Sequence, residues 1–182
     1  MLELLEGKNV NLRLVEKEDL PLLAEWIDNP AFFGEYNPLT QMSQTDLEKA
    51  RENALKNIEL ADFLIEKKDG SKIGYIQHFN YPPVKRLEIG FSMIPNERGE
   101  GYCTEAVRIM IDYLFLSKDL IRIQAQTETG NLASQKVLEK AGFSKEGNMR
   151  KCDFSRGEWR DSYLYSILRE EWKEPKILTK SP

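Results

Sequence analysis

The stretch from residue 86 to residue 127 constrains the fold more than any other part of the chain. It reads as a strand, RLEIGFSMI (86–94), a glycine loop, a helix over 100–117 and a second strand, LIRIQAQT. The helix is indicated by apolar residues that share one face, including Ala106, Ile109, Met110, Tyr113 and Leu114. A strand, a helix and a strand in this order predict a parallel crossover within a sheet.

Antiparallel hairpins are predicted on both sides of this crossover. Before it, the strand patterns are NVNLRLVE (9–16), DFLIEK (62–67) and SKIGYIQHFNY (71–81), the last two joined by the turn signal Asp69-Gly70. After it, strands over about 144–154 and 159–169 flank a turn near Gly157. The chain therefore predicts an α/β fold of α+β character, with a central, mostly antiparallel mixed sheet and helices on both faces.

Three further helices are predicted outside the crossover. EKEDLPLLAEWIDNP reads as a helix that Asp19 caps and that Asn29-Pro30 ends. An irregular aromatic segment follows over 31–43, and Ser43 or Thr45 then starts a helix that runs to about Ile58. The third helix, GNLASQKVLEKAGF, stops at Gly142, a natural left-handed C-terminal position.

Composition limits the class of protein. The chain has 182 residues, of which 41% are apolar and 31% are charged, so one domain over 1–182 is expected. A net charge of −4 argues against a nucleic-acid partner. The chain shows neither an apolar run of 18 residues nor a signal-peptide pattern, so we expect no membrane contact and a cytoplasmic location.

The two cysteines, Cys103 and Cys152, are far apart and lack the spacing of metal ligands. Two reduced thiols and no metal are therefore expected, as is usual in a cytosol. A nucleophilic cysteine is the alternative, but no helper motif accompanies either residue.

The glycine loop of the crossover, Arg98-Gly99-Glu100-Gly101, allows two interpretations. Glycines often do no more than end a loop. A strand, a glycine loop and a helix can also direct free backbone N–H groups and the positive helix end at one anion. Both nucleotide motifs fail, because Thr104 stands at the third glycine of G-x-G-x-x-G and Tyr102 stands at the lysine of G-K-[ST].

The loop resembles the acetyl-CoA pyrophosphate loop of the GNAT superfamily, the Gcn5-related N-acetyltransferases, whose pattern is Q/R-x-x-G-x-G/A. Asn96 stands at the first position of that pattern, and GYCTEA continues it as in the subgroup of ribosomal-protein-alanine N-acetyltransferases. NLASQKVLEKAGF (131–143) and GEWRDSYLYSILREEW (157–172) are similar to two further motifs of this subgroup. The resemblance covers essentially the whole chain and implies a GNAT-like fold.

The resemblance implies an enzyme that moves an acetyl group from acetyl-CoA to a primary amine by direct transfer in a ternary complex. The acceptor would be a protein N-terminus or a small amine such as a polyamine, an amino acid or an antibiotic. Two alternatives stay open: an acyltransferase with another acyl group or an alcohol acceptor, and a catalytically inert acyl-CoA-binding sensor or interaction module. A monomer and a homodimer are both compatible with the sequence.

The resemblance also assigns residues to the cofactor. Contacts are implied for Ser92, Met93, Ile94, Arg98, Gly99, Glu100, Gly101, Tyr102 and Thr104, with a backbone N–H near Ser92 or Met93 facing the thioester carbonyl. Asn131 would bind the pantetheine arm. Lys136 would reach a phosphate, or would be an ordinary solvated helix lysine.

Three residues are candidates for proton transfer. Leu138 stands where many family members carry a general-acid tyrosine, so Ser134 would protonate the leaving thiolate, or else cap local amides. Glu88, before the glycine loop, and Asp153, on the closing hairpin, would each be a base, or else a structural charge. His78 is predicted to be buried and hydrogen-bonded.

The acceptor pocket would come from segment 28–45 and the closing strands. Phe32, Phe33 and Tyr36 would supply apolar walls, and Glu35 would attract an amine. The alternative is a helix-to-helix connection packed on the core, because aromatic residues are usually buried. Asp161 is expected to support the closing hairpin.

Overall fold

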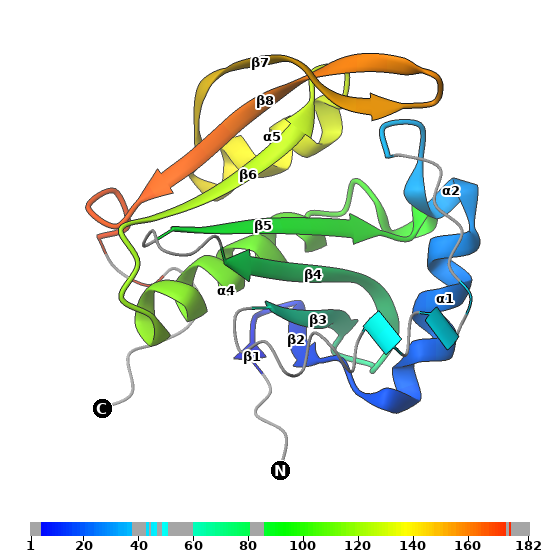
Figure 1. The fold of residues 1–182 in the computed structure, drawn as a ribbon. Helices are drawn as coiled ribbons and strands as arrows, with labels where there is room; N and C mark the ends of the chain where they lie inside the picture. Colours follow the sequence, from blue (N-terminus) through cyan, green and yellow to red (C-terminus); the bar gives the residue numbers. More distant parts are fainter. Residues whose placement is uncertain are drawn as a thin grey trace.

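The computed structural model describes residues 5–37, 43, 45, 46, 49, 50, 60–80, 86–173 and 175. Within these residues, eight strands form one sheet with the order β1-β2-β3-β4-β5-β6-β8-β7 (Figure 1). The strands are β1 (Leu5–Glu6), β2 (Val10–Leu14), β3 (Leu60–Lys67), β4 (Lys72–Asn80), β5 (Arg86–Met93), β6 (Arg122–Glu128), β7 (Ser144–Ser155) and β8 (Glu158–Leu168). The helices are α1 (Leu20–Asp28), α2 (Pro30–Phe33), α4 (Tyr102–Ser117) and α5 (Leu132–Ala141), with 3-10 turns at Lys17–Asp19 and Pro95–Glu97.

The sheet is mixed, as the sequence predicts. β5 and β6 are parallel, and α4 connects them as the crossover helix. The other neighbouring strand pairs of the described sheet are antiparallel. The closing hairpin joins the sheet through its second strand, β8, which lies beside β6, so β7 forms the outer edge.

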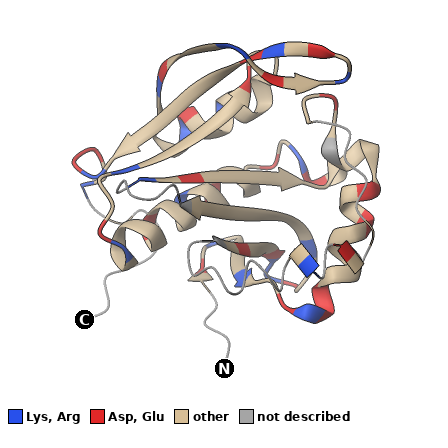
Figure 2. Ribbon diagram, viewed as in Figure 1, with Lys and Arg blue, Asp and Glu red and all other residues tan. Residues whose placement is uncertain are grey.

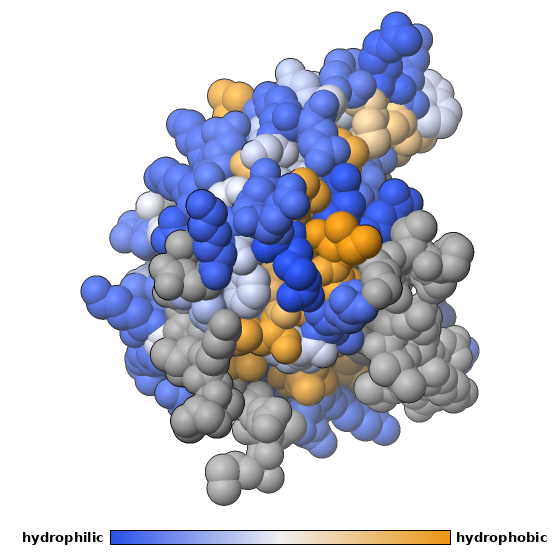
Figure 3. Space-filling view, turned by 90° about the vertical axis from the view of Figure 1, so that its left-hand side faces the viewer, coloured by the Kyte–Doolittle hydropathy of each residue, from blue (hydrophilic) through white to orange (hydrophobic). Residues whose placement is uncertain are grey.

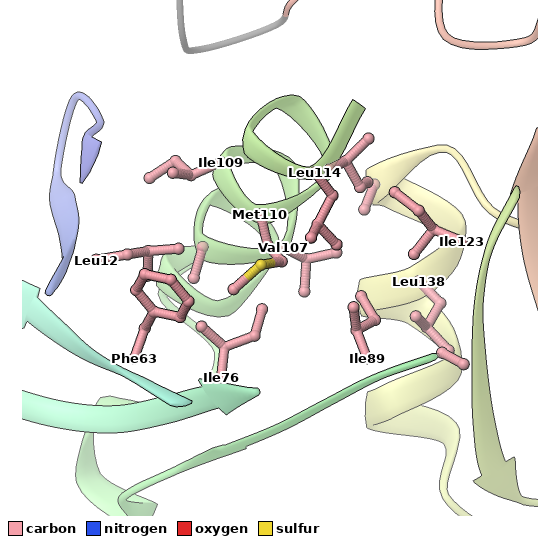
Figure 4. Packing of buried hydrophobic residues seen from close by; sticks show 14 of the residues in the cluster. Leu12, Phe63, Ile76, Ile89, Val107, Ile109, Met110, Leu114, Ile123 and Leu138 are labelled. Carbon is pink, nitrogen blue, oxygen red and sulfur yellow. The ribbon is translucent and has the colours of Figure 1, made fainter. Parts of the chain in front are cut away.

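Helices cover both faces of the sheet, which confirms that prediction. On one face, α4 and α5 close a core that includes Leu12, Phe63, Ile76, Ile89, Val107, Ile109, Met110, Leu114, Ile123 and Leu138 (Figure 4). On the other face, α1 and α2 pack Leu20, Leu23, Trp26 and Phe32 against Leu64. Phe63 and Leu64 are neighbours on β3, and the alternation of a strand sends one side chain into each core. Each fully buried side chain of this size contributes roughly 1.5–3 kcal/mol to folding.

Two helix ends have the local hydrogen bonds that the sequence predicted. Gly142 adopts a φ of 106° after α5, and its N–H donates to the carbonyls of Glu139 and Leu138. The Ser43 hydroxyl accepts the Asp46 N–H at 3.1 Å, as the predicted helix start requires. Most of the helix predicted to run to Ile58 lies outside the described residues.

Details near the N-terminus differ from the prediction. Asp19 precedes α1, but its carboxylate accepts from Arg13 and Lys72 and does not cap the helix. Burial alone would raise the pKa of Asp19, but the hydrogen bonds from these two cations hold the pKa well below its usual range. Residues 31–33, predicted to be irregular, form α2 together with Pro30, because the Asn29 side chain accepts the Ala31 N–H. The short strand β1 was not predicted.

The surface carries charges of both signs. Figure 2 shows Lys and Arg interspersed with Asp and Glu along the ribbon. On the face in Figure 3, most coloured residues are hydrophilic, and apolar residues show in a smaller central area. In the part of the chain that the structure describes, no helix is long and apolar enough to cross a bilayer.

Candidate active site

A gap between β5 and β6 is the main feature of the site. The two strands pair only from Arg86–Arg122 to Glu88–Gln124, although β5 continues to Met93 and β6 continues to Glu128. Figure 1 shows the strands diverging beyond the paired end. Each strand therefore leaves an edge of backbone N–H and C=O groups that the partner strand does not satisfy.

The register shows which backbone groups face this gap. The Ile94 N–H donates to Ile73, and the alternation of an antiparallel ladder then turns the amides of Ile94 and Ser92 toward β4. Phe91 and Met93 consequently direct their amides into the gap. Of the two amides that the sequence offered to a thioester carbonyl, those of Ser92 and Met93, only the Met93 amide faces the gap.

The glycine loop lies at the open end of β5. Gly99 and Gly101 both have a φ of 87°, a left-handed conformation that glycine adopts at little cost, and no atom lies within 4 Å of a Cβ built at either position. Gly101 is the residue before α4, and Glu100 is exposed between the glycines. Among the described residues, none accepts a hydrogen bond from the backbone amides of residues 99–104. Amides without a partner at the start of a long helix, here the 16-residue α4, are the kind of group that binds an anion in other proteins.

The side chains around the glycine loop either pack on the core or bind other segments of the chain. Tyr102 packs on the core beneath α4, and Thr104 is half-buried in the first turn. Arg98 turns away from the loop amides, donating through Nε to the Met93 carbonyl and through Nη2 to the carbonyls of Phe32 and Ala31.

Glu88 lies where β5 and β6 separate. Its side chain is 7% exposed, and its Oε2 accepts from Gln124 Nε2 at 2.9 Å and from Gln126 Nε2 at 3.2 Å. Neither glutamine was predicted to be a site residue. The sequence RIQAQTE does contain a signal for them. Gln124 and Gln126 are two residues apart on a strand, so their side chains point to the same face, on which Glu88 lies.

The start of α5 carries the second group of predicted residues. Asn131 precedes the helix, and its Oδ1 accepts the Ser134 N–H at 3.1 Å. Ser134 is half-buried, and its hydroxyl makes no hydrogen bond to a described residue, so the cap is Asn131 and not the Ser134 hydroxyl. Lys136 is exposed, and Leu138, at the position of the family tyrosine, is fully buried in the core.

Asp153 lies on β7, away from Glu88. Its Oδ2 accepts from the buried Ser162 hydroxyl at 2.7 Å and from Cys152 Sγ at 3.2 Å. Ser162 pairs with Glu128 on β6, four residues beyond Gln124, which is about 13 Å along an extended strand. Glu88 therefore lies where the gap begins, whereas Asp153 lies near the Glu128 end of β6 and is separated from the gap by β8 and β6.

The segment after α1 reaches the open end of the gap. Phe32 is 2% exposed and stacks on Trp26 and Tyr75, so the core-packing alternative accounts for this residue. The side chain of Phe33 lies outside the described residues. Glu35 is exposed and hydrogen-bonds Tyr36, which raises the pKa of that phenol, and the Tyr36 ring lies against Gly130 in the β6–α5 loop.

Several other predicted residues have structural roles. Asp161 accepts from the Lys151 N–H at 2.8 Å and from Asn148 Nδ2 at 3.2 Å, which confirms that it supports the hairpin. His78 is buried as predicted, but its Nδ1 has no hydrogen-bond partner in the described part of the chain. Cys103 and Cys152 are free thiols, and burial raises the pKa of Cys103 to about 12, which disfavours a nucleophilic thiolate. The described residues contain no group of three or more His, Cys, Asp or Glu that could hold a metal ion.

Comparison with known proteins identifies the family. A family model described as an acetyltransferase (GNAT) domain matches residues 9–144, well over half of the chain. The chain belongs to the GNAT family of acetyltransferases. It is 32% identical over 177 residues to the uncharacterized N-acetyltransferase p20 of Bacillus licheniformis, which covers 94% of this chain and 99% of p20.

Solved GNAT structures share the fold. The ribosomal-protein-S5-alanine acetyltransferase of Vibrio fischeri superposes with a TM-score of 0.80 at 25% identity, covering 94% of this chain and 99% of that one. RimJ of Mycobacterium smegmatis, in complex with a CoA disulfide, gives a TM-score of 0.79 at 25% identity over 96% of this chain and 88% of RimJ. The expected GNAT fold is thus confirmed, and the chain is an acetyl-CoA-dependent N-acetyltransferase.

Proposed function

We propose that this N-acetyltransferase transfers the acetyl group of acetyl-CoA directly to a primary amine within a ternary complex, without an acyl-enzyme. One observation carries the proposal: the unsatisfied edges of β5 and β6 open beside a glycine loop whose amides have no described partner. The gap suits an extended amide-bearing arm, and the loop suits a diphosphate. The residues present therefore fit coenzyme A at both ends.

Binding would rest mainly on backbone groups. The amides of residues 99–102 and 104 would donate to the pyrophosphate, and the Phe91 and Met93 edge would pair with the pantetheine amides. Asn131, whose Oδ1 already caps α5, has its side-chain NH₂ group left to donate to the arm. Lys136 is exposed one turn further along α5, from where it would reach a phosphate.

Transfer requires three things of this chain. The incoming ammonium must lose a proton, and Glu88 and Asp153 are the two carboxylates that can accept it. The oxyanion that develops on the thioester carbonyl needs a donor, and the Met93 N–H faces the gap. The amine nitrogen then bonds to the carbonyl carbon as the C–S bond breaks, and Ser134 would pass a proton to the departing thiolate.

The acceptor is proposed to be a protein N-terminus or a small amine. Glu35 and Tyr36 would border the acceptor at the open end of the gap, where Arg156 and Arg160 of the closing hairpin also lie close to this segment. Both kinds of acceptor occur in the names of relatives, one a ribosomal-protein-S5-alanine acetyltransferase and the other a spermidine N(1)-acetyltransferase. A panel of peptides with free N-termini and of polyamines, assayed by thiol release at fixed acetyl-CoA, tests the class.

Gly101→Asp tests the cofactor site directly. The substitution adds bulk and negative charge at the loop, and we expect the Kd for coenzyme A, measured by calorimetry, to rise roughly a hundredfold, the scale of one or two lost hydrogen bonds to a charged group. Gly70→Asp is the matched control, because Gly70 has a φ of 85°, has no atom within 4 Å of a built Cβ and lies in the β3–β4 turn. Equal coenzyme A affinity in folded Gly101→Asp and Gly70→Asp would contradict the proposed site.

A further inference from the structure

Arg98 connects three parts of the site through one guanidinium group. Its Nε donates to the Met93 carbonyl at 3.0 Å, and its Nη2 donates to the Phe32 carbonyl at 2.7 Å and to the Ala31 carbonyl at 3.3 Å. Its backbone N–H is also engaged, by the Pro95 carbonyl at 3.3 Å. The amide of Arg98 and its Nε and Nη2 donors are therefore engaged within the protein, which leaves Nη1 as the part of the guanidinium that could reach an anion.

The carbonyls that accept hydrogen bonds from Arg98 lie in two elements, β5 and α2. Met93 ends β5, on the edge that faces the gap. Ala31 and Phe32 belong to α2, a single helical turn, and their carbonyls lie toward its C-terminal end. A cation at the C-terminal end of a helix satisfies such carbonyls and complements their partial negative charge. The contact between residues 98 and 32 thus ties the cofactor loop to α2.

The segment that follows α2 continues to the acceptor end of the gap. The Gly34 carbonyl accepts from Arg156 Nη2 at 2.9 Å, on the turn of the closing hairpin. Tyr36 lies against Gly130, at the start of the loop that leads into α5. Residues 31–36, here named the strap, are therefore held by the β5–α4 loop at one end and by the hairpin and the β6–α5 loop at the other.

We propose that Arg98 is a positioning residue for the acceptor side of the site, holding the strap against β5, and not a side-chain ligand of the cofactor phosphate. The inference rests on the proposed function, because the strap borders the acceptor only if the gap holds the acyl donor. Coenzyme A bound at residues 99–104 fixes the backbone beside Arg98. Because the guanidinium joins this backbone to the strap, binding of coenzyme A also restricts the motion of the strap. The acyl donor thereby orders the acceptor side of the site.

The experiment uses the full chain and coenzyme A as the probe. Arg98→Met removes the donors, Arg98→Lys keeps the charge but loses the planar fork, and Lys140→Met is the control for loss of an exposed cation that has no role in the proposed site. Calorimetry measures the Kd for coenzyme A. Hydrogen exchange with mass spectrometry measures the protection of amides in residues 29–36, with and without coenzyme A, and circular dichroism shows that each variant is folded.

We expect Arg98→Met to bind coenzyme A with a Kd within about threefold of the wild-type value, while exchange in residues 29–36 accelerates about tenfold or more. Coenzyme A should slow exchange of this segment in the wild type and leave it unchanged in Arg98→Met and Arg98→Lys. The inference is overturned if Arg98→Met weakens coenzyme A binding tenfold or more, Arg98→Lys restores it, and strap exchange is unaltered.

The two proposals can fail separately. Absence of coenzyme A binding to the wild type would remove the proposed cofactor site, whatever the behaviour of the strap. Normal coenzyme A binding with identical strap protection in the wild type and in Arg98→Met would remove only the role given to Arg98.

Discussion

The buried histidine makes folding stability depend on pH in a way that the structure quantifies. His78 is 1% exposed, its Nδ1 has no partner among the described residues, and its ring lies near those of Phe63 and Tyr113. Burial, with a smaller effect from Lys118, lowers the pKa of His78 from 6.5 to about 4. The neutral imidazole is therefore the form that the folded protein holds.

The sign and size of the effect follow from linkage. Because the folded-state pKa lies below the unfolded-state value, the unfolded chain binds the proton more readily, and stability is lost as pH falls from 6.5 through about 4. A difference of about 2.5 pH units corresponds to about 3.4 kcal/mol at 1.36 kcal/mol per unit. That is a large share of the roughly 5–15 kcal/mol by which a domain of this kind is stable.

The assay compares the wild type with His78→Leu. We expect urea unfolding between pH 7.5 and pH 4 to show the wild type losing about 3 kcal/mol more than the variant, with most of the difference between pH 6.5 and pH 4. Carboxylates titrate in both proteins, so their contribution cancels in the comparison. His78 is the only histidine, so its proton NMR signal reports the folded-state pKa without assignment. Parallel stability curves for the two proteins, or an NMR midpoint near 6.5, would refute the reasoning.

Two further predictions concern proton transfer. Glu88→Gln and Asp153→Asn should each leave coenzyme A affinity unchanged, and the variant that removes the general base should lower kcat by about 10²–10⁴-fold. Steady-state rates with the acceptor found in the amine panel show which carboxylate is the base. Wild-type rates in both variants would exclude both carboxylates. Ser134→Ala should lower kcat by a similar order with the Kd for coenzyme A unchanged, because its amide remains capped by Asn131. A wild-type rate in Ser134→Ala would remove its hydroxyl from the mechanism.

Much of the local structure of the candidate site could be predicted from the sequence, because it depends on residues that are close together in the chain. Two glycines, separated by one residue at the start of an amphipathic helix, predicted the glycine loop. In the structure both adopt the left-handed conformation. Asn131 and Ser134 are three residues apart, so their capping contact is also local. Residues whose role depends on distant partners were assigned less well. For Phe32 the sequence left the acceptor pocket and the core as alternatives, and burial places it in the core; Asp19 was predicted to cap a helix and binds Arg13 and Lys72.

By itself, the sequence determined where the chain turns, which faces of its helices and strands are apolar, and where a glycine loop precedes a helix. Each of these depends on backbone preferences or on side-chain spacing within a few residues. Tertiary structure alone decided that β8 lies between β6 and β7, that β5 and β6 separate after Glu88, and that Arg98 binds the carbonyls of α2. These contacts join residues tens of positions apart, and their geometry is fixed only when the two cores pack on opposite faces of one sheet.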